Sequence, residues 1–486
     1  MIKNIIIRSV LTIPLRFRSI IILPLLTRLY TQEIYGAWLQ IILITEVLSN
    51  ILSLQLGVAL VRYLSAEKEP KQSIRAVFTV TLGCFLCFLF LIWLFGKEAS
   101  RLMFGNENLQ QILLIASFWI FVKTYIKIGL SVLRSLEKIG TISIRELISA
   151  LWLIFAVSVS YLIGLEIQKL ILICMVGDTI LLIWILVQLK VPFPLLWVKK
   201  SIVEVKKFLP FSLPLVVSAF FLWFTRSIDR LQIVNILGLA SVGIYGVSLQ
   251  VSAILSTILQ PIGFVLFPRV SAAWNQKNRA EVSHYFSQAF SLIIFISAPI
   301  IVGLFIVSDG LIPLLAGQNY TTSKSLILFL LLSWLAYMLY QNHLYVIHLM
   351  EKTYILPVLF IFTALVNYVL NYLLILKIGI IGAATARLVT FWMMAFIITF
   401  WARKYIKFSI PWAKIFRAIL ISVVMGLSIS WMPLNTWTQI LTAVAIGTAF
   451  YFVLLIIFRV LTFKNISDLK IELIKKPLTN LNHTDV

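Results

Sequence analysis

The sequence predicts an all-α protein that crosses a membrane many times, and three observations predict this fold class. Of the 486 residues, 61% are hydrophobic and 12% are charged, whereas about 25% are charged in soluble domains. The mean hydropathy is +1.02, which leaves too little polar surface to coat a water-soluble globule. The apolar runs are also too long for barrel strands, which alternate over about ten residues. A soluble enzyme, a disordered protein and a nucleic-acid-binding protein are therefore excluded, and no nucleic acid is expected as a partner.

About fourteen apolar segments have the length of roughly 20 residues that a helix needs to cross a bilayer. In chain order they are 9–30, 36–57, 75–96, 110–131, 143–165, 169–190, 209–235, 241–267, 285–307, 325–349, 354–376, 380–401, 415–434 and 437–460. The longest loops between them are 190–208 and 308–324, so no soluble domain is expected. A GxxxxGK[ST] phosphate-binding loop is absent from the sequence. Energy for transport is therefore expected from an ion gradient or from the gradient of the substrate.

Basic residues set the predicted orientation. The formal net charge is +23, and Lys and Arg collect in cytoplasmic loops. When the N-terminus is placed in the cytoplasm, the inner segments hold roughly four times as many Lys and Arg as the outer ones. An even number of helices then places the C-terminus in the cytoplasm as well. The predicted location is the cytoplasmic (inner) membrane of a bacterium.

A short sequence repeat divides the chain into two halves. Ile34-Tyr35-Gly36-x-x-Leu39-Gln40 recurs as Ile244-Tyr245-Gly246-x-x-Leu249-Gln250, and both copies begin the second segment of a half. Six segments separate the copies, so the halves are expected to be parallel repeats. The predicted units are an N-terminal lobe (1–207, segments 1–6), a C-terminal lobe (208–402, segments 7–12), two additional helices (403–464) and a cytoplasmic tail (465–486).

Ionisable residues inside the apolar segments are the candidate site residues, because each costs at least about 2.5–3.5 kcal/mol to insert and usually faces a bundle interior or a hydrated cavity. The candidates for a substrate cavity are Arg16, Arg18, Arg28, Lys123, Lys127, Arg226, Asp229, Arg230 and Arg387. Glu46 and Asp178 are candidates for ion or proton coupling, or for pairing with an arginine across the bundle. For the two lysines, side chains that reach the headgroups are the favoured interpretation.

Arg226, Asp229 and Arg230 lie on one helix face because they are spaced i, i+3 and i+4. Asp229 is expected to pair with either arginine, which leaves one positive charge on that face. A salt bridge that fixes helix packing and a role in substrate binding are both compatible with this spacing.

Prolines interrupt matching segments of the two halves. Pro14 and Pro24 bracket the arginines of segment 1, and Pro210 and Pro214 lie in segment 7. Interrupted segments at corresponding positions are the best sequence indication of a transport site. Mostly cationic residues at such a site favour an anionic, phosphate-bearing substrate, since guanidinium groups match phosphate oxygens.

Catalytic and metal-binding patterns are not found in the sequence. With four His and three Cys, no hydrolase triad or metal cluster is recognisable. Cys84 and Cys87 have CxxC spacing in an apolar run, where two helix-packing residues are the expected reading. No catalytic residue, metal or cofactor is therefore predicted, and the protein is not expected to be an enzyme.

Three groups of motifs resemble the polysaccharide transporter family. They are the stretch TRLYTQEIYG at 27–36, the stretch GVALVRYLS at 57–65, and the set FSLP at 211–214, IDRL at 228–231 and VGIY at 242–245. Each motif is degenerate, and their order and spacing carry the resemblance over the whole chain. The family belongs to the multidrug/oligosaccharidyl-lipid/polysaccharide (MOP) flippase superfamily.

The resemblance implies a V-shaped bundle of two six-helix lobes, similar to MATE transporters, that works by alternating access. It implies a flippase for undecaprenyl-diphosphate-linked oligosaccharides of O-antigen or a related lipopolysaccharide, with a polymerase and a chain-length regulator as further partners. By position, Arg28, Asp229 and Arg230 match charges of the family motifs. The roles of Arg16, Arg18, Lys123 and Arg387 depend on physical arguments alone.

Two other functions remain compatible with the sequence. A MATE-like multidrug/cation antiporter shares the fold, although cationic drugs favour an acidic cavity. A membrane-embedded polysaccharide polymerase or glycosyltransferase usually carries a large outer loop or catalytic acids near the interface.

Overall fold

The computed structural model describes residues 18–64, 70–190, 198–350, 352 and 354–458, and every regular element within these ranges is a helix. Thirteen of the described helices are long and apolar enough to cross a membrane. They match segments 2–14 of the sequence prediction, and the all-α membrane fold is confirmed. Segment 1 begins outside the described residues, and its described part is helical over 18–29. The predicted tail at 465–486 also lies outside the described residues.

The N-terminal half contains α2 to α8. The bounds are α2 Gln32–Leu52, α3 Leu56–Tyr63, α4 Pro70–Phe104, α5 Gln110–Ser135, α6 Ile139–Ile163, α7 Ile167–Leu189 and α8 Val198–Lys206. A short 3₁₀ turn, η2 (Glu107–Leu109), joins α4 to α5.

The C-terminal half and the additional helices contain α9 to α17. The bounds are α9 Leu209–Leu237, α10 Leu239–Ser252, α11 Ile254–Asn275, α12 Arg279–Ala316, α13 Lys324–Leu349, α14 Ile355–Ile378, α15 Ile380–Tyr405, α16 Trp412–Ser430 and α17 Trp437–Ile457. The last two pack against α12, where the Tyr451 hydroxyl donates to the Phe295 carbonyl at 2.8 Å.

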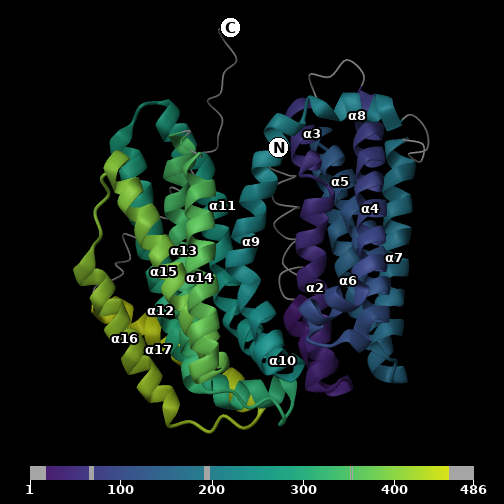
Figure 1. The fold of residues 1–486 in the computed structure, drawn as a ribbon. Coiled ribbons are helices and arrows are strands. Elements are labelled where there is room, and N and C mark those ends of the chain that lie inside the picture. The colour runs from purple at the N-terminus through teal and green to yellow at the C-terminus, as the bar shows by residue number, and fades with distance from the viewer. Residues whose placement is uncertain (1–17, 65–69, 191–197, 351, 353, 459–486) are drawn as a thin grey trace.

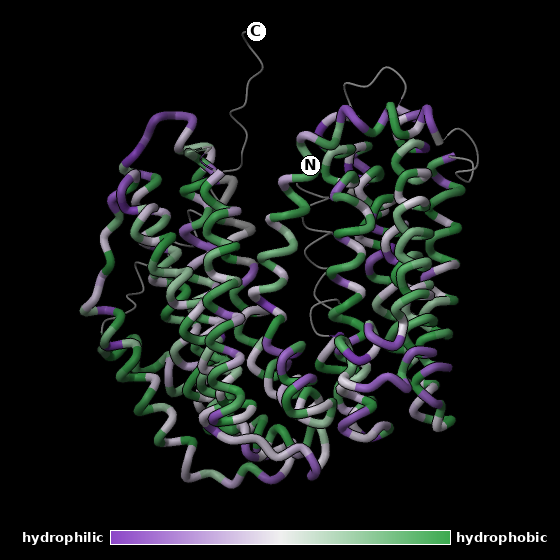
Figure 2. Tube along the Cα trace, in the orientation of Figure 1, coloured by the Kyte–Doolittle hydropathy of each residue, from purple (hydrophilic) through white to green (hydrophobic). Residues whose placement is uncertain are grey.

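Two groups of helices stand side by side and touch near one end (Figure 1). Helices α2 and α10 meet at that end, and the groups diverge toward the opposite end, where α3 and α8 lie. Apolar residues fill the long middle of the helices, whereas hydrophilic residues gather at their ends (Figure 2). Large apolar side chains such as Leu162 and Phe400 are 81% and 75% exposed on the outside. This pattern is that of a bundle whose outer faces contact lipid.

Side-chain caps begin several of the helices. The Thr31 hydroxyl accepts from the Ile34 N–H at the start of α2, and Ser323 does the same for Leu326 at the start of α13. Thr436 and Gln439 form a capping box at α17. These caps satisfy backbone donors that have no partner within the helix.

The helix interruptions lie elsewhere than the prolines suggest. Pro210 lies in the first turn of α9 and Pro214 lies inside it, and α9 remains one helix from Leu209 to Leu237. A proline in the first turn removes an N–H that has no intrahelical partner anyway. The second segment of each half is interrupted instead, at 53–55 between α2 and α3 and at Ala253 between α10 and α11.

The two copies of the sequence repeat pack against each other where the halves meet. A Cβ atom on Gly36 would lie 2.1 Å from the Leu239 carbonyl oxygen, and one on Gly243 would lie 2.5 Å from the Gln32 carbonyl oxygen. Only glycine therefore allows this approach of two helix backbones. Gln250 of the second copy donates to the hydroxyl of Tyr35 in the first at 2.8 Å. The repeat thus forms the contact between the halves.

Helix α8 is amphipathic and lies on the N-terminal half, at the end where the two halves diverge. The Glu204 carboxylate accepts from the Ser73 hydroxyl at 2.6 Å and from the Lys207 ammonium group at 2.6 Å. Burial by itself raises the pKa of Glu204, but these hydrogen bonds and the nearby lysine charges lower that pKa below its ordinary value. Glu204 therefore ties α8 to α4 as a carboxylate.

Candidate functional site

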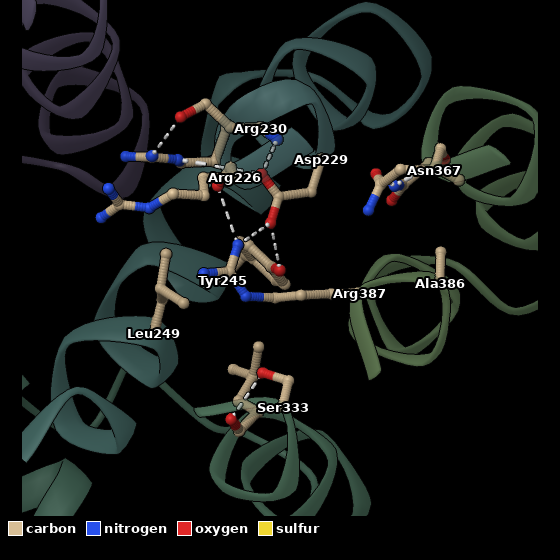
Figure 3. A network of polar contacts seen from close by, with 12 residues as sticks. Arg226, Asp229, Arg230, Tyr245, Leu249, Ser333, Asn367, Ala386 and Arg387 are labelled. Atoms are coloured by element: carbon tan, nitrogen blue, oxygen red, sulfur yellow. Dashed lines mark hydrogen bonds and ion pairs between the residues drawn. The ribbon is translucent and has the colours of Figure 1, made fainter. Parts of the chain in front are cut away.

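A buried carboxylate, Asp229 on α9, organises the polar network at the centre of the C-terminal half. Its Oδ2 atom accepts from Arg387 Nη1 at 3.0 Å and from the Tyr245 hydroxyl at 2.6 Å. Its Oδ1 atom accepts from the backbone N–H of Arg230 at 2.8 Å. Figure 3 shows Arg387 reaching from α15 toward this carboxylate. Both Asp229 and Arg387 are 2% exposed.

Arg387 also holds neighbouring helices together. Its Nη1 atom donates to the backbone carbonyl of Arg226 at 2.8 Å. The guanidinium carbon lies 4.7 Å from the centre of the Phe391 ring and 5.3 Å from that of Trp334. One side chain on α15 thus contacts α9 and α13 and neutralises Asp229.

Arg226 and Arg230 keep donors that are not used in the network. Arg230 Nε lies 4.0 Å from Asp229 Oδ1 and has no hydrogen-bond partner among the described residues. The Arg226 guanidinium lies over the Tyr337 ring, 5.4 Å from its centre. Asp229 pairs closely with Arg387 and lies 4.0 Å from Arg230, and Arg226 adds a third guanidinium group from the same helix as Arg230. The network therefore carries an excess of positive charge.

Lys123 and Asp178 form a second polar cluster, in the N-terminal half. The Lys123 ammonium group lies 2.8 Å from Asp178 Oδ2, which also accepts from Trp119 Nε1 at 2.7 Å. Ser149 donates to the other carboxylate oxygen at 3.3 Å. Lys123 therefore turns inward to a partner on α7, and its ammonium group does not extend to the headgroups.

Glu46 on α2 belongs to neither cluster. Its side chain is exposed on α2, and its charge acts on both Lys127 and Arg230. Lys127 also donates to the side-chain oxygen of Asn50. An exposed carboxylate thus interacts electrostatically with a cation from each half of the molecule.

Arg28 lies at the contact between the halves. Its Nη2 atom donates to the Leu314 carbonyl at 3.1 Å, and Gln32 donates to the Asn319 carbonyl at 2.6 Å. Asn235 on α9 donates to the Leu102 carbonyl on α4 at 2.9 Å. These bonds bridge the halves at the end where α2 and α10 meet.

Two predicted residues remain, and the structure describes one of them. Arg18 is half-buried in the helical stretch 18–29, where the charges of Asp178 and Glu146 act on it. Arg16 lies outside the described residues. The structure therefore separates the predicted set into a C-terminal network, an N-terminal cluster and an inter-lobe bond.

Two uncharged residues of the repeat, Gln40 and Tyr245, also belong to the site. A search for ionisable residues in the apolar segments does not find them. Gln40 donates to the Arg230 carbonyl at 3.2 Å, and Tyr245 bonds Asp229. The repeat itself is the sequence signal that could have found them, because it marks equivalent positions in both halves.

Metal ligands are not gathered in the described part of the chain, where no group of three or more His, Cys, Asp or Glu side chains could hold an ion. His343 is stacked against Phe408 and shares a hydrogen bond of 2.8 Å with Thr399. The polar chemistry of the described site is therefore that of arginine, carboxylate, amide and hydroxyl groups.

Comparison with known sequences identifies a family and one relative. The profile of a family described as "Polysaccharide biosynthesis protein" matches residues 25–325. A probable low-salt glycan biosynthesis flippase of Haloferax volcanii is 22% identical over 315 residues. That match covers 62% of this chain and 65% of the relative, which is less than two thirds of its length.

Comparison with solved structures identifies the fold. A structure described as a lipid II flippase, MurJ, in an inward closed conformation has a TM-score of 0.76 and 19% identity, covering 93% of this chain and 98% of that one. An inward-facing multidrug MATE transporter of the MOP superfamily has a TM-score of 0.64 and 12% identity, covering 82% and 97%. A MOP superfamily transporter from Pyrococcus furiosus has a TM-score of 0.56 and 11% identity, covering 82% and 93%.

Proposed function

Because the chain belongs to the polysaccharide biosynthesis protein family, we propose that it is a flippase for lipid-linked glycans. The proposed substrate is an undecaprenyl-diphosphate-linked oligosaccharide of O-antigen or a related surface polysaccharide. It moves from the cytoplasmic to the periplasmic leaflet by alternating access, with the sugars between the lobes and the lipid tail in the bilayer. The MOP-type fold and the Haloferax volcanii relative support this assignment.

The observation that carries the proposal is the excess positive charge around Asp229. Arg387 already neutralises this carboxylate, so the charges of Arg226 and Arg230 are available to a ligand. A diphosphate supplies several anionic oxygens that accept from guanidinium groups in two-pronged geometry. We assign the diphosphate to Arg226 and Arg230, and we assign Arg387 to the positioning of Asp229.

A MATE-like cation antiporter is less well supported by the same residues. A cationic substrate favours an unpaired carboxylate, whereas the two carboxylates that are buried in the described part of the chain, Asp229 and Asp178, each lie within 3.0 Å of a basic side chain. A polymerase or glycosyltransferase is also less well supported, since the relatives found are transporters.

Orientation and partners follow from the proposal. We place the protein in the bacterial inner membrane with both termini in the cytoplasm, so the wide end near α8 faces the cytoplasm. The bonds of Arg28 and Gln32 then close the periplasmic side and must break when substrate leaves. A polymerase and a chain-length regulator of the same pathway would act on the exported unit. Glu46 and Asp178 are the proposed candidates for ion or proton coupling.

The test is to locate undecaprenyl-linked intermediates in a strain that lacks this protein. Complete repeat units trapped in the cytoplasmic leaflet, without surface polymer, are the expected result. Single units displayed on the periplasmic side would mean that flipping is intact and would assign a polymerase instead. Normal intermediates and normal polymer, in a strain shown to contain no second flippase, would contradict the proposal and favour the antiporter.

A further inference from the structure

A small uncharged pocket lies between α11, α12 and α13, apart from the arginines. Its volume is about 40 Å³. Gln260, Gln341, Asn342 and Tyr345 supply polar groups to its lining, and the remaining lining residues are apolar. A pocket without a charged side chain is poorly suited to a phosphate or a carboxylate, because a desolvated charge needs a countercharge. Its chemistry therefore fits an uncharged polar group.

Asn342 has an unused hydrogen-bond donor at this pocket. The residue is 4% exposed, and its Nδ2 atom has no partner among the described residues. A buried donor without a partner costs about 1–3 kcal/mol, so an unpartnered group of this kind calls for an explanation, such as a water or a ligand that binds beside it. The position of Asn342 in the pocket lining points to a ligand acceptor.

The pocket and the arginine network share Tyr337 as a neighbour. Gln341 Nε2 donates to the Tyr337 hydroxyl at 2.8 Å, and the Arg226 guanidinium lies over the Tyr337 ring. Tyr337 and Gln341 are four residues apart on α13 and therefore lie on the same helix face. One turn of α13 thus connects the proposed diphosphate site with the uncharged pocket.

Gly263 on α11 packs closely against Tyr345 in the wall of the pocket. A Cβ atom at this position would lie 2.8 Å from the Tyr345 hydroxyl, closer than a real contact allows. A pocket of this size has room for roughly two or three water-sized groups, and so for one substituent of a sugar.

We propose that this pocket binds an uncharged polar substituent of the first sugar, such as a hydroxymethyl or acetamido group. The inference rests on the proposed function, since it requires the diphosphate to lie at Arg226 and Arg230. The pocket then recognises the sugar, while the arginines bind the diphosphate that all such lipids share. Selectivity among glycans would come from Asn342 and Gln341, separately from the electrostatic attraction.

The experiment compares two probes on the purified full chain in detergent. One is the sugar-bearing undecaprenyl-linked lipid extracted from a strain that lacks the protein, and the other is undecaprenyl diphosphate without sugar. Asn342→Leu keeps a similar size but removes the donor. This variant should raise the Kd for the sugar-bearing probe about tenfold, which corresponds to about 1.4 kcal/mol of binding free energy. The Kd for the sugar-free probe should stay unchanged.

A second variant and a control make the test specific. Gly263→Ala narrows the pocket from α11 and should show the same selective loss. Thr363→Val removes a fully buried hydroxyl on α14 that bonds its own helix, and it should bind both probes as the wild type does. Arg226→Gln should lower the binding affinity for both probes.

The outcomes separate the two proposals. If Asn342→Leu and Gly263→Ala bind both probes normally, or lose affinity for both probes equally, the assignment of the pocket to a sugar is wrong. The flippase assignment then still stands. If the wild type binds neither probe, or if no sugar-bearing lipid accumulates in the deletion strain, the proposed function fails and the pocket assignment fails with it.

Discussion

Asp229 Oδ2 and Arg387 Nη1 lie 3.0 Å apart although the two residues are 158 positions apart in the chain. Each is 2% exposed, and each lies within a helix long enough to span the bilayer. A single unpaired charge in such a place would be strongly unfavourable. The stability of the protein should therefore tolerate replacement of both residues better than replacement of one.

We therefore expect Arg387→Met and Asp229→Asn each to destabilise the protein by about 3–5 kcal/mol, because each leaves an uncompensated partner. The double variant should recover most of this loss. The measurement is a double-mutant cycle of thermal stability in detergent. Additive losses in the double variant would show that the two residues do not depend on each other.

Arg226 and Arg230 should affect transport more than stability. Neither guanidinium neutralises a carboxylate at close range, since Arg230 Nε is 4.0 Å from Asp229. Arg226→Ala and Arg230→Ala should impair export at least tenfold with normal membrane abundance. Arg226→Lys, which keeps the charge but loses the forked geometry, should be intermediate. Normal polymer export by both alanine variants would contradict the assignment of the diphosphate.

The glycine contact between the halves should tolerate no side chain. Gly36→Ala places a methyl group 2.1 Å from the Leu239 oxygen, and such overpacking typically costs about 1–3 kcal/mol. Export and thermal stability should both fall. Gly83→Ala is the matched control, since nothing apart from its own helix backbone lies within 4 Å of its Cβ position. Equal behaviour of the two variants would mean that the halves do not need this close approach.

Glu46→Gln should separate binding from turnover. The side chain is exposed, so stability should change little. Its charge acts on Lys127 and Arg230, and its removal should strengthen binding of undecaprenyl diphosphate several-fold. Tighter holding should slow release and lower the export rate. The measurements are the Kd of the purified chain and polymer export in cells; an unchanged Kd would exclude electrostatic competition by Glu46.

The helices could be predicted well because each depends only on a local run of apolar residues. Thirteen of fourteen segments appear among the described residues, with the second segment of each half divided by a break. The break between α2 and α3 depends on Leu54 and Gln55, which adopt positive φ values of 47° and 52°. Neither residue type favours that conformation, so the sequence contains no signal for it.

The pairing of the charged residues could not be predicted in the same way. Helical spacing placed Asp229 beside Arg226 and Arg230, but its partner comes from α15. Likewise Asp178 pairs with Lys123 across 55 positions of sequence, from α7 to α5. Periodicity orders residues around one helix but does not say which faces of different helices meet. The repeat identified equivalent positions, whereas its role as the contact between the halves became visible only in three dimensions.

The bonds between the halves have an evolutionary consequence. Arg28, Gln32, Gln40 and Asn235 all donate to main-chain carbonyls, those of Leu314, Asn319, Arg230 and Leu102. A carbonyl oxygen is present whatever the side chain, so the accepting positions are free to change identity at this bond while the donors are not. Selection for closure of the transporter should therefore act on the side-chain donors and not on the side chains of the accepting residues. Saturation mutagenesis should find sensitive donors opposite tolerant acceptors at Leu314, Asn319 and Leu102, and homologues should be able to diverge in sequence on one side of the closure without compensating changes on the other.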